Sequence, residues 1–211
     1  MLHYWVEFSQ VAIAHLLAVA SPGPDFALVL KQSLSHGRRT AICTSFGIGA
    51  AILLHVTYSL LGLGLLIRGS ETWFNAVKYA GAVYIAWLGV QALRARRRTS
   101  NDQPGPGPAL ERPGGGRSFL QGFLTNALNP KATLFFISLF ALVVSPQTPR
   151  LIQAGYGLWM AVVTAAWFCL VSVLFTKREV RRAFLQHGHW IDRALGVVFL
   201  GFAASLAFAT F

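Results

Sequence analysis

Charged side chains are scarce in this chain. Asp, Glu, Lys and Arg make up 12% of its 211 residues, about half of what a soluble domain of this length carries. Only seven residues are acidic, and only Asp25 lies clearly within a long apolar run. No carboxylate pair is therefore expected for acid–base catalysis. Phosphate-binding, zinc-protease and serine-hydrolase motifs are also absent. We predict no enzyme and no catalytic residue.

Cysteine is nearly absent too. Cys43 and Cys169 both lie within apolar runs, without the spacing of a disulfide framework or a zinc site. His187-Gly188-His189 has ligand-like spacing, but no Cys or carboxylate accompanies it. We expect no metal and no cofactor. The formal charge of +11 does not predict a nucleic-acid partner, because the basic residues are confined to short segments between apolar runs.

Long apolar runs are what the chain has in abundance. Hydrophobic residues make up 55% of it, and the mean hydropathy is +0.54. This predicts an all-α, polytopic membrane protein surrounded by a lipid bilayer. Each predicted span reaches the roughly 20 residues that cross a bilayer. The six predicted spans are residues 9–30, 41–67, 73–93, 118–144, 151–175 and 190–211.

The basic residues predict the orientation. Of 18 Lys and Arg, 14 lie between spans one and two, between spans three and four, or around the start of span six. Only Arg68 and Arg150 lie on the opposite side, while Lys78 and Lys131 fall within spans. Because Lys and Arg accumulate in cytoplasmic segments, both termini are expected outside, on the periplasmic face of a bacterial inner membrane.

A Pro- and Gly-rich segment at residues 99–117 divides the chain. Its composition is typical of a flexible cytoplasmic linker. We expect one transmembrane domain with a first repeat at 1–98 and a second at 118–211. An odd number of spans per repeat makes the two copies oppositely oriented, which is the inverted-repeat plan of secondary transporters. The first and fourth spans, each interrupted at a proline motif, are the corresponding broken helices.

Ser21-Pro22-Gly23-Pro24-Asp25 interrupts the first span. Both prolines remove backbone donors, the glycine loosens the backbone, and the carboxylate is costly at membrane depth. Broken helices at this depth occur where protein covers them or where they line a watery cavity. The stretch is therefore a candidate binding site. The alternative is a proline kink from which Asp25 reaches an aqueous interface.

Asn129-Pro130-Lys131 interrupts the fourth span. Ser21-Pro22 and Asn129-Pro130 both have the form of an N-cap followed by a first helical residue. Each is expected to begin a half-helix whose N-terminus faces a substrate carboxylate. We hypothesise that Asp25 and Lys131 pair when the site is empty, since buried membrane charges are usually paired. The alternative for Lys131 is snorkelling to the interface.

These motifs resemble those of the LysE/RhtB family. They are Ser21–Asp25, the glycine-rich second span, Lys78–Tyr84 with Trp87-Leu88-Gly89, and Phe119-x-x-Gly122-x-x-x-Asn126-Ala127-Leu128-Asn129-Pro130-Lys131 followed by Phe135-Phe136. The resemblance covers nearly the whole chain. It implies an exporter of amino acids in the bacterial inner membrane, driven by the proton-motive force, and adds Asn126 to the candidate site. It does not indicate which amino acid is carried.

Several weaker candidates remain. His55, in the second span, is either a proton relay or a packed, hydrogen-bonded residue. Lys78 is expected to snorkel rather than to contact substrate. Gly47, Gly49 and Ala51 predict close helix packing. A channel is the alternative to a carrier, and a membrane-embedded enzyme comes after it. A homo-oligomer is left open.

Overall fold

The computed structural model describes residues 2–69, 71–96, 113–145 and 147–208. These ranges form eight α-helices and contain no strand. The helices are α1 (Leu2–Ala20), α2 (Pro24–Ser35), α3 (Arg38–Gly69), α4 (Glu71–Leu93), α5 (Gly115–Ala127), α6 (Pro130–Leu142), α7 (Arg150–Leu174) and α8 (Arg178–Phe208).

The predicted apolar runs are helical, and the proline motifs break two of them. α1 and α2 meet at a bend of 52° across residues 21–23, and α5 and α6 are separated by residues 128–129. Among the described residues, 38–62 and 150–174 each form a helix long and apolar enough to cross a membrane, and the bent α1–α2 pair makes a third candidate. The all-helical membrane class is thus confirmed.

Helix ends differ from the predicted boundaries. α1 begins at Leu2 and α8 at Arg178, well before the apolar runs that they contain. A helix continues past its apolar stretch because its backbone hydrogen bonds are satisfied within the helix, whatever the side chains. α5 begins at Gly115, so the last three residues of the predicted linker are helical; this turn lies against Cys43 of α3. Residues 99–112 of the linker fall outside the described ranges.

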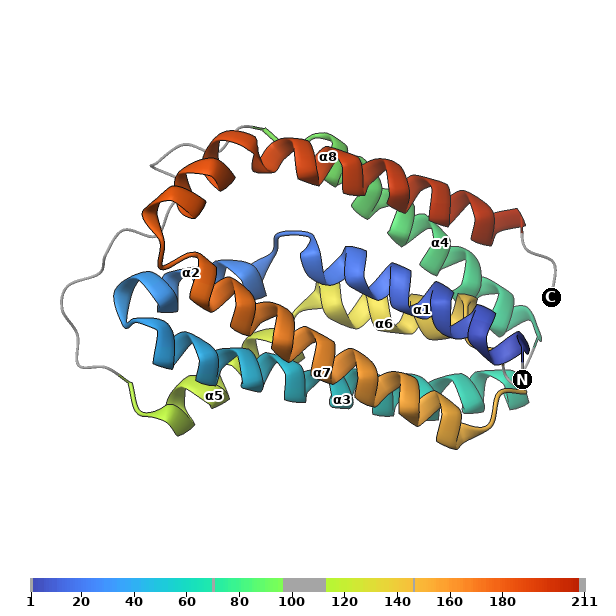
Figure 1. Ribbon diagram of the computed structural model, residues 1–211. Helices are drawn as coiled ribbons and strands as arrows, with labels where there is room; N and C mark the ends of the chain where they lie inside the picture. The colour runs from blue at the N-terminus through green and yellow to red at the C-terminus, as the bar shows by residue number, and fades with distance from the viewer. Residues whose placement is uncertain (1, 70, 97–112, 146, 209–211) are drawn as a thin grey trace.

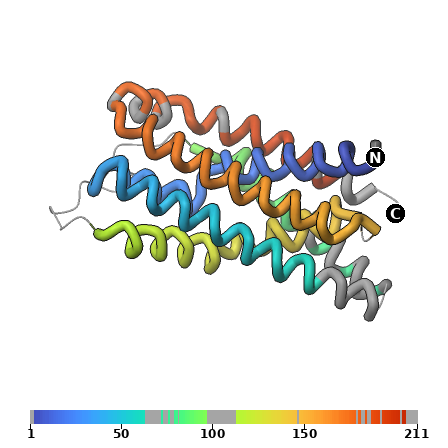
Figure 2. Tube along the Cα trace, turned by 60° about the horizontal axis from the view of Figure 1, so that its bottom comes forward, coloured from blue at the N-terminus to red at the C-terminus, as the bar shows by residue number. Residues whose placement is uncertain are grey.

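The helices form an elongated bundle (Figures 1 and 2). α3 packs along α5 and α7, and α4 packs along α8 and α6. In Figure 1, α4 and α8 form one layer, α3, α5 and α7 form another, and α1, α2 and α6 lie between them. The start of α1 and the end of α8 lie at the same end of the bundle. Three of the four helical segments that flank the breaks, α1, α2 and α6, therefore lie between the two layers, whereas α5 lies within one of them.

Glycines bring the backbones of α3, α5 and α7 into contact. A Cβ on Gly47 would overlap the carbonyl oxygen of Phe119, and one on Gly122 would overlap that of Thr44. A Cβ on Gly49 would lie 2.7 Å from that of Ala165 in α7. The predicted packing role of Gly47 and Gly49 is confirmed. The contact between α3 and α5 therefore positions α5, the helix that leads into the second break.

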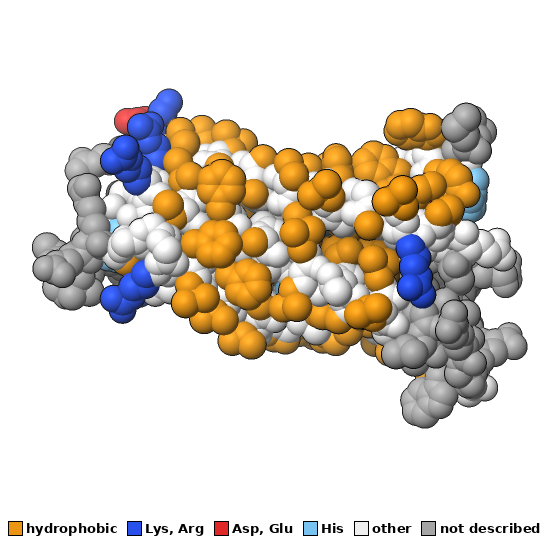
Figure 3. Space-filling view, turned by 90° about the horizontal axis from the view of Figure 1, so that it is seen from below, with side chains coloured by type: hydrophobic (Ala, Val, Ile, Leu, Met, Phe, Trp, Pro, Cys, Tyr) orange, Lys and Arg blue, Asp and Glu red, His pale blue; other side chains and the backbone are white. Residues whose placement is uncertain are grey.

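The outside of the bundle is largely apolar. Figure 3 shows a broad band of hydrophobic side chains on one face, with Lys and Arg gathered toward its two ends. Large side chains such as Leu151 (85% exposed), Val162 (60%) and Leu158 (59%) project from α7. Contiguous exposed apolar surface on this scale is expected of a protein whose surroundings are lipid.

Candidate functional site

The first break is organised around Gly23 rather than Ser21. α1 ends as Ser21 N–H donates to the carbonyl of Leu17 at 3.1 Å. α2 begins at Pro24, with Gly23 as an extended N-cap (φ −166°) that makes no side-chain hydrogen bond. The prediction that Ser21 caps a helix starting at Pro22 is therefore wrong. Pro24 suits the first helical position because it has no N–H to satisfy, and the Ser21 hydroxyl is engaged elsewhere.

The second break follows the prediction. Asn129 is the N-cap of α6, and its Oδ1 accepts a hydrogen bond from the backbone N–H of Lys131 at 3.0 Å. Pro130 occupies the first helical position. The Asn129 side chain also faces the first break, because its Nδ2 donates to Asp25 Oδ2 at 3.0 Å. One asparagine thus caps its own helix and binds the carboxylate of the other.

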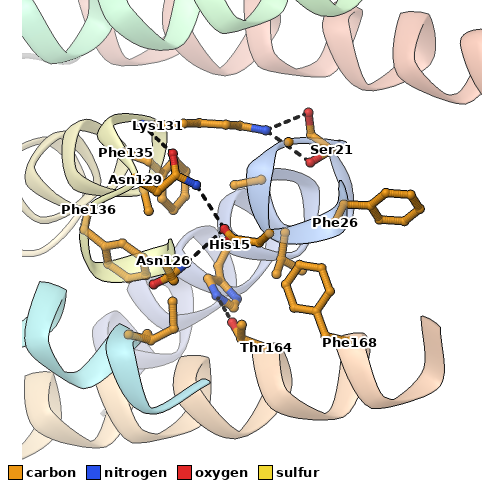
Figure 4. A pocket seen from close by; sticks show the side chains of 16 residues that line it. His15, Ser21, Phe26, Asn126, Asn129, Lys131, Phe135, Phe136, Thr164 and Phe168 are labelled. Atoms are coloured by element: carbon orange, nitrogen blue, oxygen red, sulfur yellow. Dashed lines mark hydrogen bonds between the residues drawn. The ribbon is translucent and has the colours of Figure 1, made fainter. Parts of the chain in front are cut away.

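Asp25 links the two halves of the chain. Its Oδ2 accepts a second hydrogen bond, also of 3.0 Å, from Asn126 Nδ2 near the end of α5. The dashed lines from Asn126 and Asn129 converge in Figure 4. Its other oxygen, Oδ1, is buried and has no hydrogen-bond partner among the described residues. One carboxylate oxygen is fixed and the second is available.

Lys131 does not pair directly with Asp25. Its Nζ donates to the carbonyl oxygen and to the Oγ of Ser21, both at 3.1 Å. The side chain lies across the first break, where a Cβ on Gly23 would be 3.6 Å from Nζ (Figure 4). The hypothesised approach of Lys131 to Asp25 therefore holds as an electrostatic interaction within a shared cavity, without a direct ion pair, whereas the snorkelling alternative is wrong. Ser21 marks the C-terminal end of α1, where the negative end of the helix dipole favours an ammonium group.

His55 extends the hydrogen-bonded cluster into α3. It is fully buried, stacked on Phe136 with ring centroids 5.3 Å apart. Its Nε2 lies 3.1 Å from both the carbonyl oxygen and the Oδ1 of Asn126, and its Nδ1 contacts the Tyr58 hydroxyl. Two acceptors at Nε2 require that this nitrogen carry a hydrogen. His55 is thus packed and also connected through Asn126 to Asp25.

A small cavity opens at these groups. Its volume is about 50 Å³, and α1, α2, α3, α5, α6 and α7 contribute to its wall. Asp25, Asn126, Asn129 and Lys131 all line it, and Figure 4 shows the side chains of Asn126, Asn129 and Lys131 beside one another. His15 lines it as well and lies within hydrogen-bonding distance of Thr164, at 3.0 Å. Sequence reasoning did not place His15 in this wall, because only the packing of α1 on α7 brings it there.

Two further acidic residues are buried, contrary to the expectation that Asp25 is the only one at depth. Glu7, 3% exposed, accepts hydrogen bonds from Ser145 N–H and the Thr148 hydroxyl. Asp192, 5% exposed, lines a cavity beside the first break. Glu7 precedes the predicted first span, and Asp192 lies near the start of the sixth. Neither was therefore predicted to lie deep within the membrane. The side chain of Lys78 lies outside those described.

No metal centre emerges from the described residues. Among them, no three His, Cys, Asp or Glu side chains lie close enough together to hold an ion. The chemistry of the site is instead that of a polar cluster buried among apolar side chains, at two opposed helix breaks. Such a cluster suits recognition of a small polar solute. Fold and site together define a helical membrane transporter.

The chain belongs to the LysE type translocator family, whose model matches residues 16–210. It is 35% identical to the threonine efflux protein of Escherichia coli K12, over 94% of this chain and 96% of that protein. It is 31% identical to the leucine efflux protein of Klebsiella pneumoniae, over 96% and 95% of the two chains. No solved structure matches. The predicted family is confirmed, and it places the chain among multi-pass membrane translocators of small molecules rather than among enzymes.

Proposed function

We propose that this protein exports an amino acid from the bacterial cytoplasm by proton-coupled secondary transport. The two relatives described above are named for threonine and leucine efflux. The observation that carries the proposal is the position of Asp25 between two broken helices. Asn126 and Asn129 hold one oxygen of its carboxylate, and the other oxygen has no hydrogen-bond partner among the described residues. An ionisable residue at a protein-lined break within the membrane is a characteristic substrate or proton site of transporters.

The proposed topology has six spans in two inverted repeats. The pairs α1–α2 and α5–α6 each form one broken span, followed in each half by two continuous helices. The corresponding helices α3 and α7 pack on each other, as do α4 and α8, which supports a twofold relation between the halves. Both termini lie in the periplasm, and the basic segments lie in the cytoplasm.

The site has groups for both charges of a zwitterion. The N-termini of α2 and α6 present backbone N–H groups and the positive ends of helix dipoles, which favour a carboxylate. Lys131, beside them, adds a cation. The unpartnered Oδ1 of Asp25 accepts either the substrate ammonium group or the coupled proton. The roles of Ser21, Pro22, Gly23, Pro24 and Pro130 are to form the breaks.

Proton coupling fits the hydrogen-bonded chain that leads away from Asp25. Tyr58, His55 and Asn126 connect the carboxylate to the middle of α3. One proton moving down a potential of 100 mV releases about 2.3 kcal/mol, or more than tenfold in substrate concentration. In this proposal Asp25 releases its proton inward as substrate binds, and takes up another from the periplasm after substrate leaves.

Purified protein in proteoliposomes tests the function. With L-threonine or L-leucine inside the vesicles, we expect saturable efflux that an imposed proton gradient accelerates and a protonophore slows. Toxic loads of single amino acids, applied to cells with and without the protein, identify the substrate through intracellular pools. Efflux that rises linearly with the amino-acid concentration and does not depend on the proton gradient would instead indicate a channel. That result would overturn the proposal.

A further inference from the structure

A second cavity lies on the other side of Lys131. Its volume is about 380 Å³, within the range of roughly 300–1,000 Å³ that small-molecule sites occupy. Three residues, Ser21, Gly23 and Lys131, line both this cavity and the smaller one at Asp25. The contact of Lys131 with Ser21 therefore forms the partition between them. Figure 4 shows this contact at one edge of the small cavity, with the ribbons of α4 and α8 beyond it.

The larger cavity carries two opposite charges. Lys131 reaches it from α6 and the nearly buried Asp192 from α8. Lys131 interacts electrostatically with both carboxylates, Asp25 on one side and Asp192 on the other. The remaining wall comes from the first break, at residues 21–24, and from α4, where Trp87 and Gln91 stand beside Leu88 and Ala92. A cation, an anion and an apolar wall are what an amino acid zwitterion requires.

The helices that hold Asp192 and Lys131 are firmly placed. α8 crosses α4 closely at Gly89 and Gly196, where added Cβ atoms would meet the opposite helix at 3.0 Å or less. Arg193, next to Asp192, donates to the carbonyl of Ala95 just past the end of α4 at 3.2 Å. On α6, Tyr84 of α4 donates to the Lys131 carbonyl at 3.3 Å. The backbones are fixed, whereas the Lys131 side chain is long enough to turn.

We propose that this cavity is the loading site for substrate and that Asp192 binds the substrate's α-ammonium group. The inference rests on the proposed export of amino acids. The substrate carboxylate binds Lys131 in place of Ser21, which opens the partition toward Asp25. Under the proposed topology, the cavity adjoins the basic, cytoplasmic ends of α4 and α8, which is the side from which an exporter collects its cargo. Asp192 is then a specificity-determining residue for molecules that carry an amine.

The isosteric variant Asp192→Asn tests this assignment. Two probes compete with radiolabelled L-threonine: unlabelled L-threonine and its hydroxy-acid analogue, in which a hydroxyl replaces the α-ammonium group. Losing a charged hydrogen bond costs threonine roughly 10- to 100-fold in affinity. The hydroxy acid, which makes no ionic contact with Asp192, changes about twofold or less. We therefore expect Asp192→Asn to erase most of the preference for the amino acid.

Matched variants separate recognition from folding. Asp192→Glu keeps the carboxylate and should retain the preference, while Gln91→Ala changes an uncharged residue of the same wall and should retain it as well. If Asp192 only anchors α8, Asp192→Asn weakens both ligands equally. That equal loss, or an unchanged preference, would overturn the inference.

A measurement on the unaltered protein needs no variant to fold. A carbodiimide modifies buried carboxyl groups, and mass spectrometry measures modification at each acidic residue. We expect L-threonine to protect Asp192, whereas the hydroxy acid protects it far less. Equal modification with and without L-threonine would overturn the loading site. If the unaltered protein exports neither L-threonine nor any other amino acid, the proposed function itself fails, an outcome distinct from failure at Asp192.

Discussion

The two helix breaks face each other but are built differently. The break between α5 and α6 spans two residues and is capped by its own Asn129 side chain. The break between α1 and α2 spans three residues, and Gly23 caps α2 without a side-chain bond. Lys131, from the other half of the chain, ties this first break together through Ser21. The second break is thus self-supporting, and the first depends on the second.

Asp25 and Lys131 occupy the same position in their helices. Asp25 follows Pro24 at the start of α2 as Lys131 follows Pro130 at the start of α6. Each side chain crosses to the other break, Asp25 to Asn126 and Asn129, and Lys131 to Ser21. A carboxylate is favoured near helix N-termini, whereas an ammonium group is favoured at the C-terminal end of α1. The opposite charges of Asp25 and Lys131 therefore explain why each side chain reaches across to the other break.

The largest expected effect is on transport, from Asp25→Asn. The variant keeps the shape of the side chain but removes its charge and its capacity to carry a proton. Removing a hydrogen-bonded charge costs up to about 3 kcal/mol, so we expect transport to fall roughly 100-fold. Efflux from proteoliposomes, normalised to reconstituted protein, measures it. The control is Glu7→Gln, a buried carboxylate on the first turns of α1, roughly 20 Å along the helix from the end that leads into the first break; equal losses in both variants would contradict a special role for Asp25.

The helix α5, which leads into the second break, should not tolerate a larger side chain where it packs against α3. A Cβ at Gly122 would overlap the backbone of Thr44 in α3. Overpacking of this kind costs about 1–3 kcal/mol, and more where only backbone can yield. We expect Gly122→Ala to lower the unfolding temperature and the yield of purified protein. Gly116→Ala, in the same helix with open space at its Cβ, is the control and should leave both unchanged.

Asn129 has two separable tasks. Asn129→Ala removes the cap of α6 and the bond to Asp25, whereas Asn129→Ser retains a capping oxygen and loses only the bond to Asp25. The cap is worth about 1 kcal/mol. Thermal unfolding should therefore distinguish the two variants, with Ser near the original stability, while both reduce efflux severalfold. A Ser variant as unstable as the Ala variant would show that the cap is not what supports this break.

The smallest effect on the free energy of unfolding is expected from a substitution at Gly23. Its φ of −166° is open to any residue, and an added Cβ would meet Lys131 only at an ordinary contact distance of 3.6 Å. We expect Gly23→Ala to change the free energy of unfolding by about 0.5 kcal/mol or less, far less than Gly122→Ala. Equal destabilisation in a side-by-side thermal melt would mean that the two breaks are equally tight.

Much of this protein was open to prediction from its sequence. Apolar runs dictate helices because a membrane-embedded backbone must satisfy its hydrogen bonds internally. The prolines dictated where two helices break, and Asn129-Pro130 dictated how α6 begins, since capping is a local interaction. The family motifs pointed to Asp25, Asn126, Asn129 and Lys131, which the structure brings together. Each of these inferences rests on residues close together in the chain.

The tertiary structure decided which distant groups meet. Gly23 rather than Ser21 caps α2, and Ser21 instead binds Lys131, more than a hundred residues away. Asp192 enters a cavity beside Lys131 only because α8 crosses α4 at Gly89 and Gly196. Sequence patterns report the local cost of placing a residue in lipid or in a helix. Which charged side chains lie close to each other across the bundle depends on where the helices cross. Those crossings are set by packing between whole helices.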